Sequence, residues 1–243
     1  MGVSHLLYLL LTYLVASVPF GLVITTLYGR DADIRRSGSG NIGATNVARV
    51  YGWAMAGWVV LLDALKGLLP TAGALWLWPE AGLWWPGLVA LTAFMAHCYP
   101  VYLEFRGGKG VATGAGGLLA LSPWATVPAI AVWMALLKGS GRSSVAALGA
   151  ATSLVGLSWW LDPDVLPVVV MLCLGILTTH VPNIRRLIRG EEKTIVRPVR
   201  WGRTTEDATH AEALLAQGPA GGRPTPLWKE RIDPLAIEEP PAS

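Results

Sequence analysis

Long apolar runs separated by short polar stretches dominate the hydropathy pattern of this chain, as in residues 6–27, 54–62, 82–96 and 167–179. A helix that crosses a membrane needs about 20 mostly apolar residues, and several runs approach or exceed that length. The predicted membrane helices cover residues 4–28, 53–78, 82–103, 111–122, 123–137, 143–160 and 165–183. The predicted fold class is therefore all-α, a polytopic membrane helical bundle of about seven transmembrane segments, some of them short or broken.

The placement of Lys and Arg decides whether residues 111–137 form one helix or two. All the basic connections fall on one side of the membrane only if this stretch is broken at Ser122–Pro123 into two segments. The connections that carry Lys or Arg are 29–50, 104–110, 138–142 and the segment after 183. The positive-inside rule then places these loops and the C-terminus in the cytoplasm and the N-terminus outside. The two short segments can be re-entrant or pack inside the bundle.

Composition favours a membrane protein over a soluble domain with a Trp-rich core. Only 14% of the 243 residues are charged, whereas soluble domains average roughly 25%. Cys98 and Cys173 lie inside apolar runs and are predicted to be small buried hydrophobic residues, not a disulfide or a metal site. An aromatic belt at the membrane interface is predicted from tryptophans near the ends of the runs. These are Trp76, Trp78, Trp84, Trp85, Trp159 and Trp160.

The chain is predicted to divide into an integral membrane domain, residues 1–203, and a tail, residues 204–243. From about residue 204 the composition shifts to Pro, Gly, Thr, Glu and Ala without sustained periodicity. Such composition is typical of disorder. We expect a disordered cytoplasmic tail with at most a short helix near residues 208–216.

The first polar loop, residues 35–49, concentrates Gly, Ser, Asn and Arg. Its GxGxxG pattern is not a dinucleotide site, because it follows a predicted transmembrane helix and no strand precedes it. Glycines let successive backbone N–H groups converge on an anion, and a helix starting near Thr45 would point its positive end there. The candidate phosphate-binding residues are Gly38, Gly40, Asn41, Thr45, Asn46 and Arg49. The alternative is a polar turn whose arginines only obey the positive-inside rule.

The second polar loop places Lys109 among Gly107, Gly108 and Gly110, at the mouth of a predicted helix. It lacks the GxxxxGK[ST] pattern of a Walker A loop. These four residues are further phosphate-binding candidates, and the alternative is a tight basic turn.

The third polar cluster lies where the last predicted span leaves the membrane, at residues 180–192. Pro182 is predicted to kink or end the helix. An interfacial amphipathic turn would explain the arginines that follow, but it would not require His180 or Asn183.

Three ionisable residues lie inside predicted spans. Asp63 and Lys66 are spaced i,i+3 and could form an ion pair, and His97 lies in the third span. Intramembrane ionisable groups are functional candidates by default, although a structural pair and a hydrogen-bonded core histidine are open alternatives. No metal site is predicted, because no HExxH, Cys/His or paired-acid pattern occurs.

At these loops the sequence resembles the PlsY family, the membrane-bound acyl-phosphate:glycerol-3-phosphate acyltransferases of bacteria. The matching stretches are GSGNIGATNVAR at 38–49, LLDALKG at 61–67, HCYPVYLEFRGGKGVAT at 97–113 and HVPNIRRLIRGEE at 180–192. The resemblance covers roughly residues 10–192, in the family's order and with its seven-span topology.

The resemblance implies transfer of a fatty acyl group from acyl phosphate to the sn-1 hydroxyl of glycerol 3-phosphate, which gives lysophosphatidic acid and phosphate. It makes residues 1–203 the acyltransferase domain and places Arg49 and Lys109 in the active site, with Ser39, His180 and Asn183 as catalytic residues. Asp63, Lys66, His97 and Glu192 are candidate supporting residues. Because the donor is already activated, we expect direct transfer without an acyl-enzyme.

The expected partners are glycerol 3-phosphate, fatty acyl phosphate and the lipid bilayer of the bacterial inner membrane, with no cofactor, metal or nucleic acid. The soluble enzyme that makes acyl phosphate is a candidate protein partner. Two other functional classes are alternatives. A transporter for a phosphorylated solute would suit broken helices, but no internal repeat occurs. A phospholipid head-group transferase usually needs paired acidic metal ligands, which are not seen.

Overall fold

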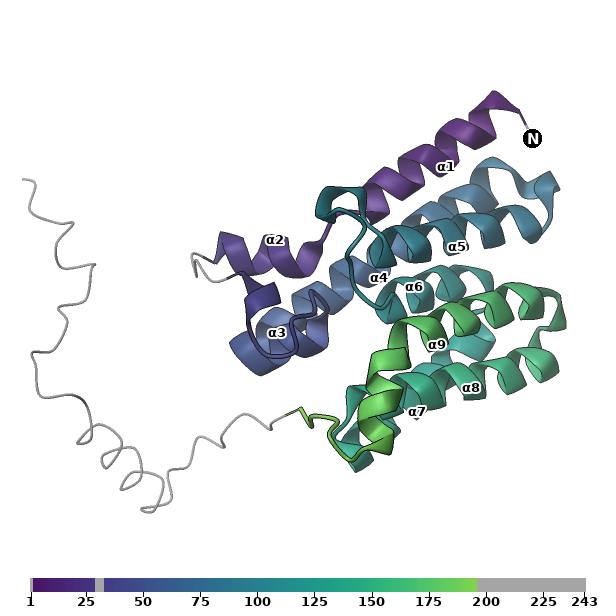
Figure 1. The fold of residues 1–243 in the computed structure, drawn as a ribbon. Helices are drawn as coiled ribbons and strands as arrows, with labels where there is room; N and C mark the ends of the chain where they lie inside the picture. The colour runs from purple at the N-terminus through teal and green to yellow at the C-terminus, as the bar shows by residue number, and fades with distance from the viewer. Residues whose placement is uncertain (1, 29–32, 196–243) are drawn as a thin grey trace, which may run out of the picture. The chain divides into compact units, whose positions relative to one another are not determined.

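The computed structural model describes residues 2–28 and 33–195, and within these ranges it contains helices and no strand. The predicted tail, residues 204–243, lies outside the described residues. The helices are α1 (Val3–Ala16), α2 (Phe20–Leu27), α3 (Ala44–Tyr51), α4 (Trp53–Leu77), α5 (Trp84–Cys98), α6 (Val111–Leu121), α7 (Pro123–Ser140), α8 (Ser143–Leu161) and α9 (Leu166–Ile188). The all-α membrane bundle predicted from the sequence is confirmed (Figure 1).

Fewer helices are long enough to cross the membrane than the seven predicted segments suggest. Four helical stretches are long and apolar enough to span a membrane, or up to five if the bent pair α1 and α2 counts as one span. That pair, predicted as a single helix over 4–28, is bent by 42° at residues 17–19. The predicted break at Ser122 is present, and α6 has only 11 residues. At 1.5 Å per residue α6 extends about 17 Å, too short to cross a bilayer alone.

The short helix α6 lies inside the bundle, in contact with α4, α5, α7 and α9 (Figure 1). Small residues allow this close packing. A Cβ atom built on Gly67 of α4 would lie 2.0 Å from the carbonyl oxygen of Thr113. One built on Gly116 of α6 would lie 2.0 Å from the carbonyl oxygen of Ala64. Glycine at these two positions therefore lets the α4 and α6 backbones touch, as is common between membrane helices.

Apolar side chains cover much of the bundle's outer surface, as expected for a protein that faces lipid. Leu6, Leu69 and Leu174 are all more than half exposed. Among the predicted belt residues, Trp76, Trp84, Trp159 and Trp160 are exposed, whereas Trp85 is buried against Val89 and Ala74. Both cysteines are buried and free, as predicted.

The last helix, α9, runs through Pro182 and ends at Ile188. The proline therefore does not end the helix, because a single lost hydrogen bond is tolerated when neighbouring elements hold the next turn. Figure 1 shows the final turns of α9 leaving the direction of the rest of the helix. His180 and Asn183, three residues apart on this part of α9, are both buried.

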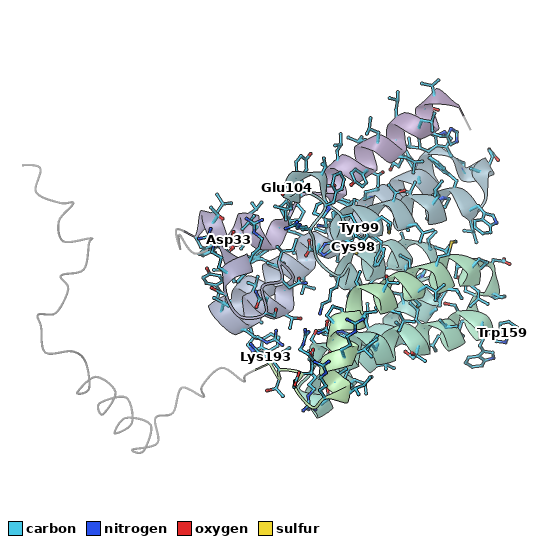
Figure 2. The ribbon with its side chains drawn as sticks, in the orientation of Figure 1. Asp33, Cys98, Tyr99, Glu104, Trp159 and Lys193 are labelled. Atoms are coloured by element: carbon cyan, nitrogen blue, oxygen red, sulfur yellow. The ribbon has the colours of Figure 1, made fainter. Side chains whose placement is uncertain are left out.

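The basic loops meet at one end of the bundle. The Oγ1 of Thr45 lies 2.8 Å from the Oγ of Ser143, and the Oγ1 of Thr179 donates to the carbonyl oxygen of Lys109 at 3.2 Å. Figure 2 shows Asp33 and Lys193 at the end of the bundle remote from Trp159. The stretch between Lys109 and Ser143 thus leaves this end and returns to it, so its prediction as two segments is confirmed.

Candidate active site

The first polar loop is organised by the buried side chain of Asn46, which is 1% exposed. Its Nδ2 donates to the carbonyl oxygens of Ile34 (3.1 Å), Ser37 (3.0 Å) and Asn41 (2.8 Å), while its Oδ1 accepts the N–H of Ser39 at 2.7 Å. Asn46 was predicted to bind phosphate. The structure shows both ends of its amide engaged with the loop backbone, so Asn46 shapes the loop, and phosphate binding by Asn46 stays a prediction.

Two glycines beside Ser39 have backbone conformations that favour glycine. Gly38 and Gly40 have φ angles of +63° and +73°. A Cβ atom on Gly38 would also lie 2.2 Å from Oδ1 of Asn46. The loop therefore curves tightly around the Asn46 amide and leaves Ser39 exposed between the two glycines. The Oδ1 of Asn41 accepts the N–H of Gly43 at 2.8 Å, directly before α3.

The second polar loop lies against the end of α5. The N–H groups of Gly107 and Gly108 donate to the carbonyl oxygens of Cys98 and His97, both at 3.0 Å. A Cβ atom on Gly107 would lie 2.2 Å from the same His97 oxygen, so the approach requires glycine. These bonds fix the backbone immediately before Lys109.

Lys109 is a partly buried cation with an altered proton affinity. Burial lowers the pKa of its ammonium to about 8; nearby Glu192 opposes this shift, and nearby Arg186 and Arg49 add to it. Lys109, Arg49, Arg186 and Glu192 therefore lie close enough to interact electrostatically. Three cations and one carboxylate leave this group with excess positive charge.

The carboxylate of Glu192 holds the third polar cluster together. Its Oε1 accepts hydrogen bonds from Nδ2 of Asn183 (2.6 Å) and Oγ of Ser144 (2.7 Å), and its Oε2 accepts from Nε of Arg186 at 2.7 Å. Burial would raise the pKa of Glu192, but the hydrogen bonds from Asn183, Ser144 and Arg186 outweigh it and lower the pKa overall. Glu192 is therefore a structural anion that orients Asn183 and Arg186.

His180 has a defined tautomer in its neutral form. Its Nδ1 lies 2.8 Å from the carbonyl oxygen of Ile176. A carbonyl can only accept, so Nδ1 carries the proton and Nε2 is left as an acceptor. His180 is 2% exposed, so a substrate group would have to reach it from within the site.

Arg49 extends from α3 to the segment that follows α9. Its Nη2 donates to the carbonyl oxygen of Lys193 at 3.1 Å, and its Nε lies 3.5 Å from that of Thr194. Burial lowers the pKa of Arg49, an effect that Glu192 opposes. The guanidinium retains further N–H donors for an anion.

Most of the predicted site residues thus come together at one end of the bundle, and the structure adds three. Ser143, Ser144 and Arg186 were not predicted; Ser143 meets Thr45, and the other two bind Glu192. The predicted Asp63–Lys66 ion pair is confirmed at 2.8 Å, with His97 at 3.5 Å from Asp63. Within residues 2–28 and 33–195, no group of three or more His, Cys, Asp and Glu could hold a metal.

Comparisons with known proteins show which proteins this chain is similar to. The family model for glycerol-3-phosphate acyltransferase matches residues 6–190. The chain is 48% identical over 189 residues to the glycerol-3-phosphate acyltransferase of Anaeromyxobacter sp. (strain Fw109-5), covering 74% of this chain and 91% of that protein. It is 43% identical over 189 residues to that of Myxococcus xanthus (strain DK1622), covering 76% of this chain and 96% of the relative.

Two solved structures are also similar. Both are crystal structures of PlsY, an integral membrane glycerol 3-phosphate acyltransferase, one in a glycerol 3-phosphate form and one in a lysophosphatidic acid form. The first superposes with a TM-score of 0.73 and the second with 0.72. Each is 34% identical in sequence and covers 79% of this chain and 95% of the solved chain.

Proposed function

The chain belongs to the glycerol-3-phosphate acyltransferase family, and from that premise we propose that its acyl donor is a fatty acyl phosphate and that transfer is direct. The acceptor is glycerol 3-phosphate and the products are lysophosphatidic acid and inorganic phosphate. The observation that supports this most is the convergence of three cations, Arg49, Lys109 and Arg186, with two glycine-rich loops. In a reaction in which both substrates carry phosphate, the protein needs cationic side chains close to both phosphates.

In the proposed reaction the sn-1 hydroxyl oxygen attacks the acyl carbonyl carbon. A new ester C–O bond forms, and the bond between the acyl carbon and the phosphate oxygen breaks. Arg49 and Lys109 stabilise the negative charge on the phosphates, the largest electrostatic contribution expected of such a site. The hydroxyl proton goes to a basic acceptor, for which the Nε2 of His180 and the departing phosphate are the two candidates.

Positioning accounts for the remaining chemistry. Ser39 lies exposed between Gly38 and Gly40, where it would hold a phosphate or carbonyl oxygen. Asn183, oriented by Glu192, would hold the glycerol phosphate beside His180. Because acyl phosphate is already activated, orientation and electrostatics can supply the rate enhancement without a covalent nucleophile.

The proposed location is the bacterial inner membrane, with the basic end of the bundle in the cytoplasm. The Lys and Arg residues of the connecting loops gather at this end, and the positive-inside rule places such loops in the cytoplasm. Acyl phosphate and glycerol 3-phosphate would then be taken from the cytoplasmic side. We include the soluble enzyme that makes acyl phosphate as a candidate partner there.

A phosphate-release assay on the full chain purified in detergent tests the proposal. Acyl phosphate and glycerol 3-phosphate together should release phosphate and form lysophosphatidic acid, in EDTA as well as in Mg²⁺. Acyl-CoA in place of acyl phosphate should give no lysophosphatidic acid. Turnover with acyl-CoA, or turnover lost in EDTA and restored by Mg²⁺, would overturn the proposed donor or the proposed metal independence respectively.

A further inference from the structure

Three ionisable side chains are buried together inside the bundle, apart from the proposed chemistry. Asp63 and Lys66 on α4 and His97 on α5 are 3%, 4% and 5% exposed. The Nζ of Lys66 lies 2.8 Å from Oδ1 of Asp63, and the Nδ1 of His97 lies 3.5 Å from the same oxygen. Ionisable groups at such depth are costly and usually carry a function.

Lys66 connects this cluster to the first polar loop. Its Nζ donates a hydrogen bond of 2.9 Å to the carbonyl oxygen of Val18, in the break between α1 and α2. The helix after the break, α2, rests directly on the loop: a Cβ atom on Gly21 would lie 1.8 Å from the carbonyl oxygen of Ile42. Lys66 therefore links α4 to the break before α2, and α2 supports the loop that contains Ser39.

His97 connects the cluster to the second polar loop. Its carbonyl oxygen accepts the N–H of Gly108, and a Cβ atom on Gly108 would lie 2.0 Å from its Nε2. The imidazole thus lies against the loop backbone one residue before Lys109. Any shift of the ring would be transmitted to that backbone, because no side chain separates the two.

We propose that Asp63, Lys66 and His97 are positioning residues that set the separation of the two polar loops for binding of glycerol 3-phosphate and the acyl donor. Asp63 is the shared partner, because it contacts both Lys66, which holds α2, and His97, which supports the loop of Lys109. The inference rests on the proposed role of the two loops in phosphate binding. Stability alone would not require this trio, because buried ion pairs can often be replaced by apolar residues of similar volume without loss of stability.

The double variant Asp63→Leu/Lys66→Met tests the proposal, because it removes both charges together and leaves neither unpaired. The unfolding temperature in detergent should stay near that of the parent, while KM for glycerol 3-phosphate rises by about 10- to 100-fold, the cost of a small misplacement of binding groups. Thr71→Val is the matched control. Thr71 is a buried α4 residue whose hydroxyl donates to the carbonyl oxygen of Gly67 in the same helix, and its loss should leave KM near the parent value.

A folded double variant with the parent's KM would overturn the inference, as would an equal rise in KM for Thr71→Val. If the double variant does not fold, His97→Ala and His97→Gln decide. His97→Ala should raise KM. His97→Gln, which keeps a polar side chain against the loop, should bring KM part of the way back to the parent value. A parental KM in His97→Ala overturns the proposal. Failure of the proposed function can be told apart from failure of this inference. If the two loops did not bind phosphate, Arg49→Ala and Lys109→Ala would themselves retain parental kinetics.

Discussion

The Nη2 of Arg49 donates a hydrogen bond of 3.1 Å to the carbonyl oxygen of Lys193, 144 residues further along the chain. This contact joins α3 to the segment after α9 and gives the guanidinium a fixed direction. An arginine held in this way loses little further side-chain entropy when an anion binds. Arg189, at the end of α9, is exposed, and within residues 2–28 and 33–195 no side-chain hydrogen bond holds its guanidinium.

We therefore expect Arg49→Ala and Lys109→Ala to be far more damaging than Arg189→Ala. A lost charge-assisted phosphate contact is worth about 1.5–3 kcal/mol, which corresponds to roughly 10- to 100-fold in kcat/KM. Steady-state kinetics with acyl phosphate and glycerol 3-phosphate would measure this. Equal and mild effects in all three variants would favour basic residues that only set the topology.

The pH dependence of kcat/KM should show an alkaline limb from Lys109. Burial lowers the pKa of this residue to about 8, so the ammonium is charged below that pH and loses its proton above it. Phosphate binding by Lys109 is therefore complete well below pH 8 and is lost as the pH rises through about 8. The profile of kcat/KM reports groups of the free enzyme and should fall above this pH.

Lys109→Arg is the matched variant for the pH profile. The guanidinium stays charged throughout the accessible range, so the alkaline limb should disappear even if the absolute rate falls. An unchanged limb in Lys109→Arg would assign the titration to another group.

The sequence predicted the fold well where patterns are local. Apolar runs gave the helices, and the basic loops correctly placed the break at Ser122. Contacts between segments that are far apart in the sequence could not be predicted from these local patterns. Arg186 resembled any interfacial arginine, and Ser144 any small residue at a helix start, until folding brought both to Glu192.

Residue type also did not reveal which polar side chain shapes the first loop. Asn46 lies among glycines and next to Thr45, as a phosphate-binding residue would. Only the structure shows its amide bonded to four loop backbone groups. The 42° bend between α1 and α2 was missed because residues 4–28 are mostly apolar on both sides of Pro19 and carry no Lys, Arg, Asp or Glu that would mark an interruption.

Glu192→Gln should reduce kcat/KM about tenfold or more, because the neutral amide no longer holds the Arg186 guanidinium and can accept only through one oxygen. Lys109 and Arg186 would also lose their compensating anion, so the protein should unfold at a lower temperature. Glu191→Gln is the control, since Glu191 is the exposed neighbour. Comparable losses in both variants would show that Glu192 has no special role.

The topology prediction concerns single cysteines introduced at residues 35, 106 and 142, after Cys98 and Cys173 have been replaced. All three positions should be inaccessible to a membrane-impermeant thiol reagent in intact cells, whereas cysteines at 79 and 162 should react. Residue 142 is the critical position, because its loop contacts Glu192 through Arg142 Nε at 3.3 Å. Labelling of 142 from outside would contradict the proposed orientation.

The role of Ser39 distinguishes direct transfer from a mechanism with an acyl-enzyme. A nucleophilic serine needs a base within hydrogen-bond reach and a group that orients that base. In the part of the chain that the structure describes, the Ser39 backbone N–H bonds to Asn46, and no hydrogen bond joins its hydroxyl to a histidine or carboxylate. His180 is buried on α9, with its Nδ1 bonded to Ile176 and not to an acid.

We therefore expect ternary-complex kinetics and no burst of phosphate when acyl phosphate is added without glycerol 3-phosphate. Ser39→Ala should lose most activity, because a positioning hydroxyl is removed, and Ser39→Cys should not accumulate an acyl thioester. Rapid-quench phosphate release and mass spectrometry of the peptide covering residues 37–49 would measure both. An acylated peptide, or a burst equal to the enzyme concentration, would establish Ser39 as a nucleophile while leaving the overall reaction unchanged.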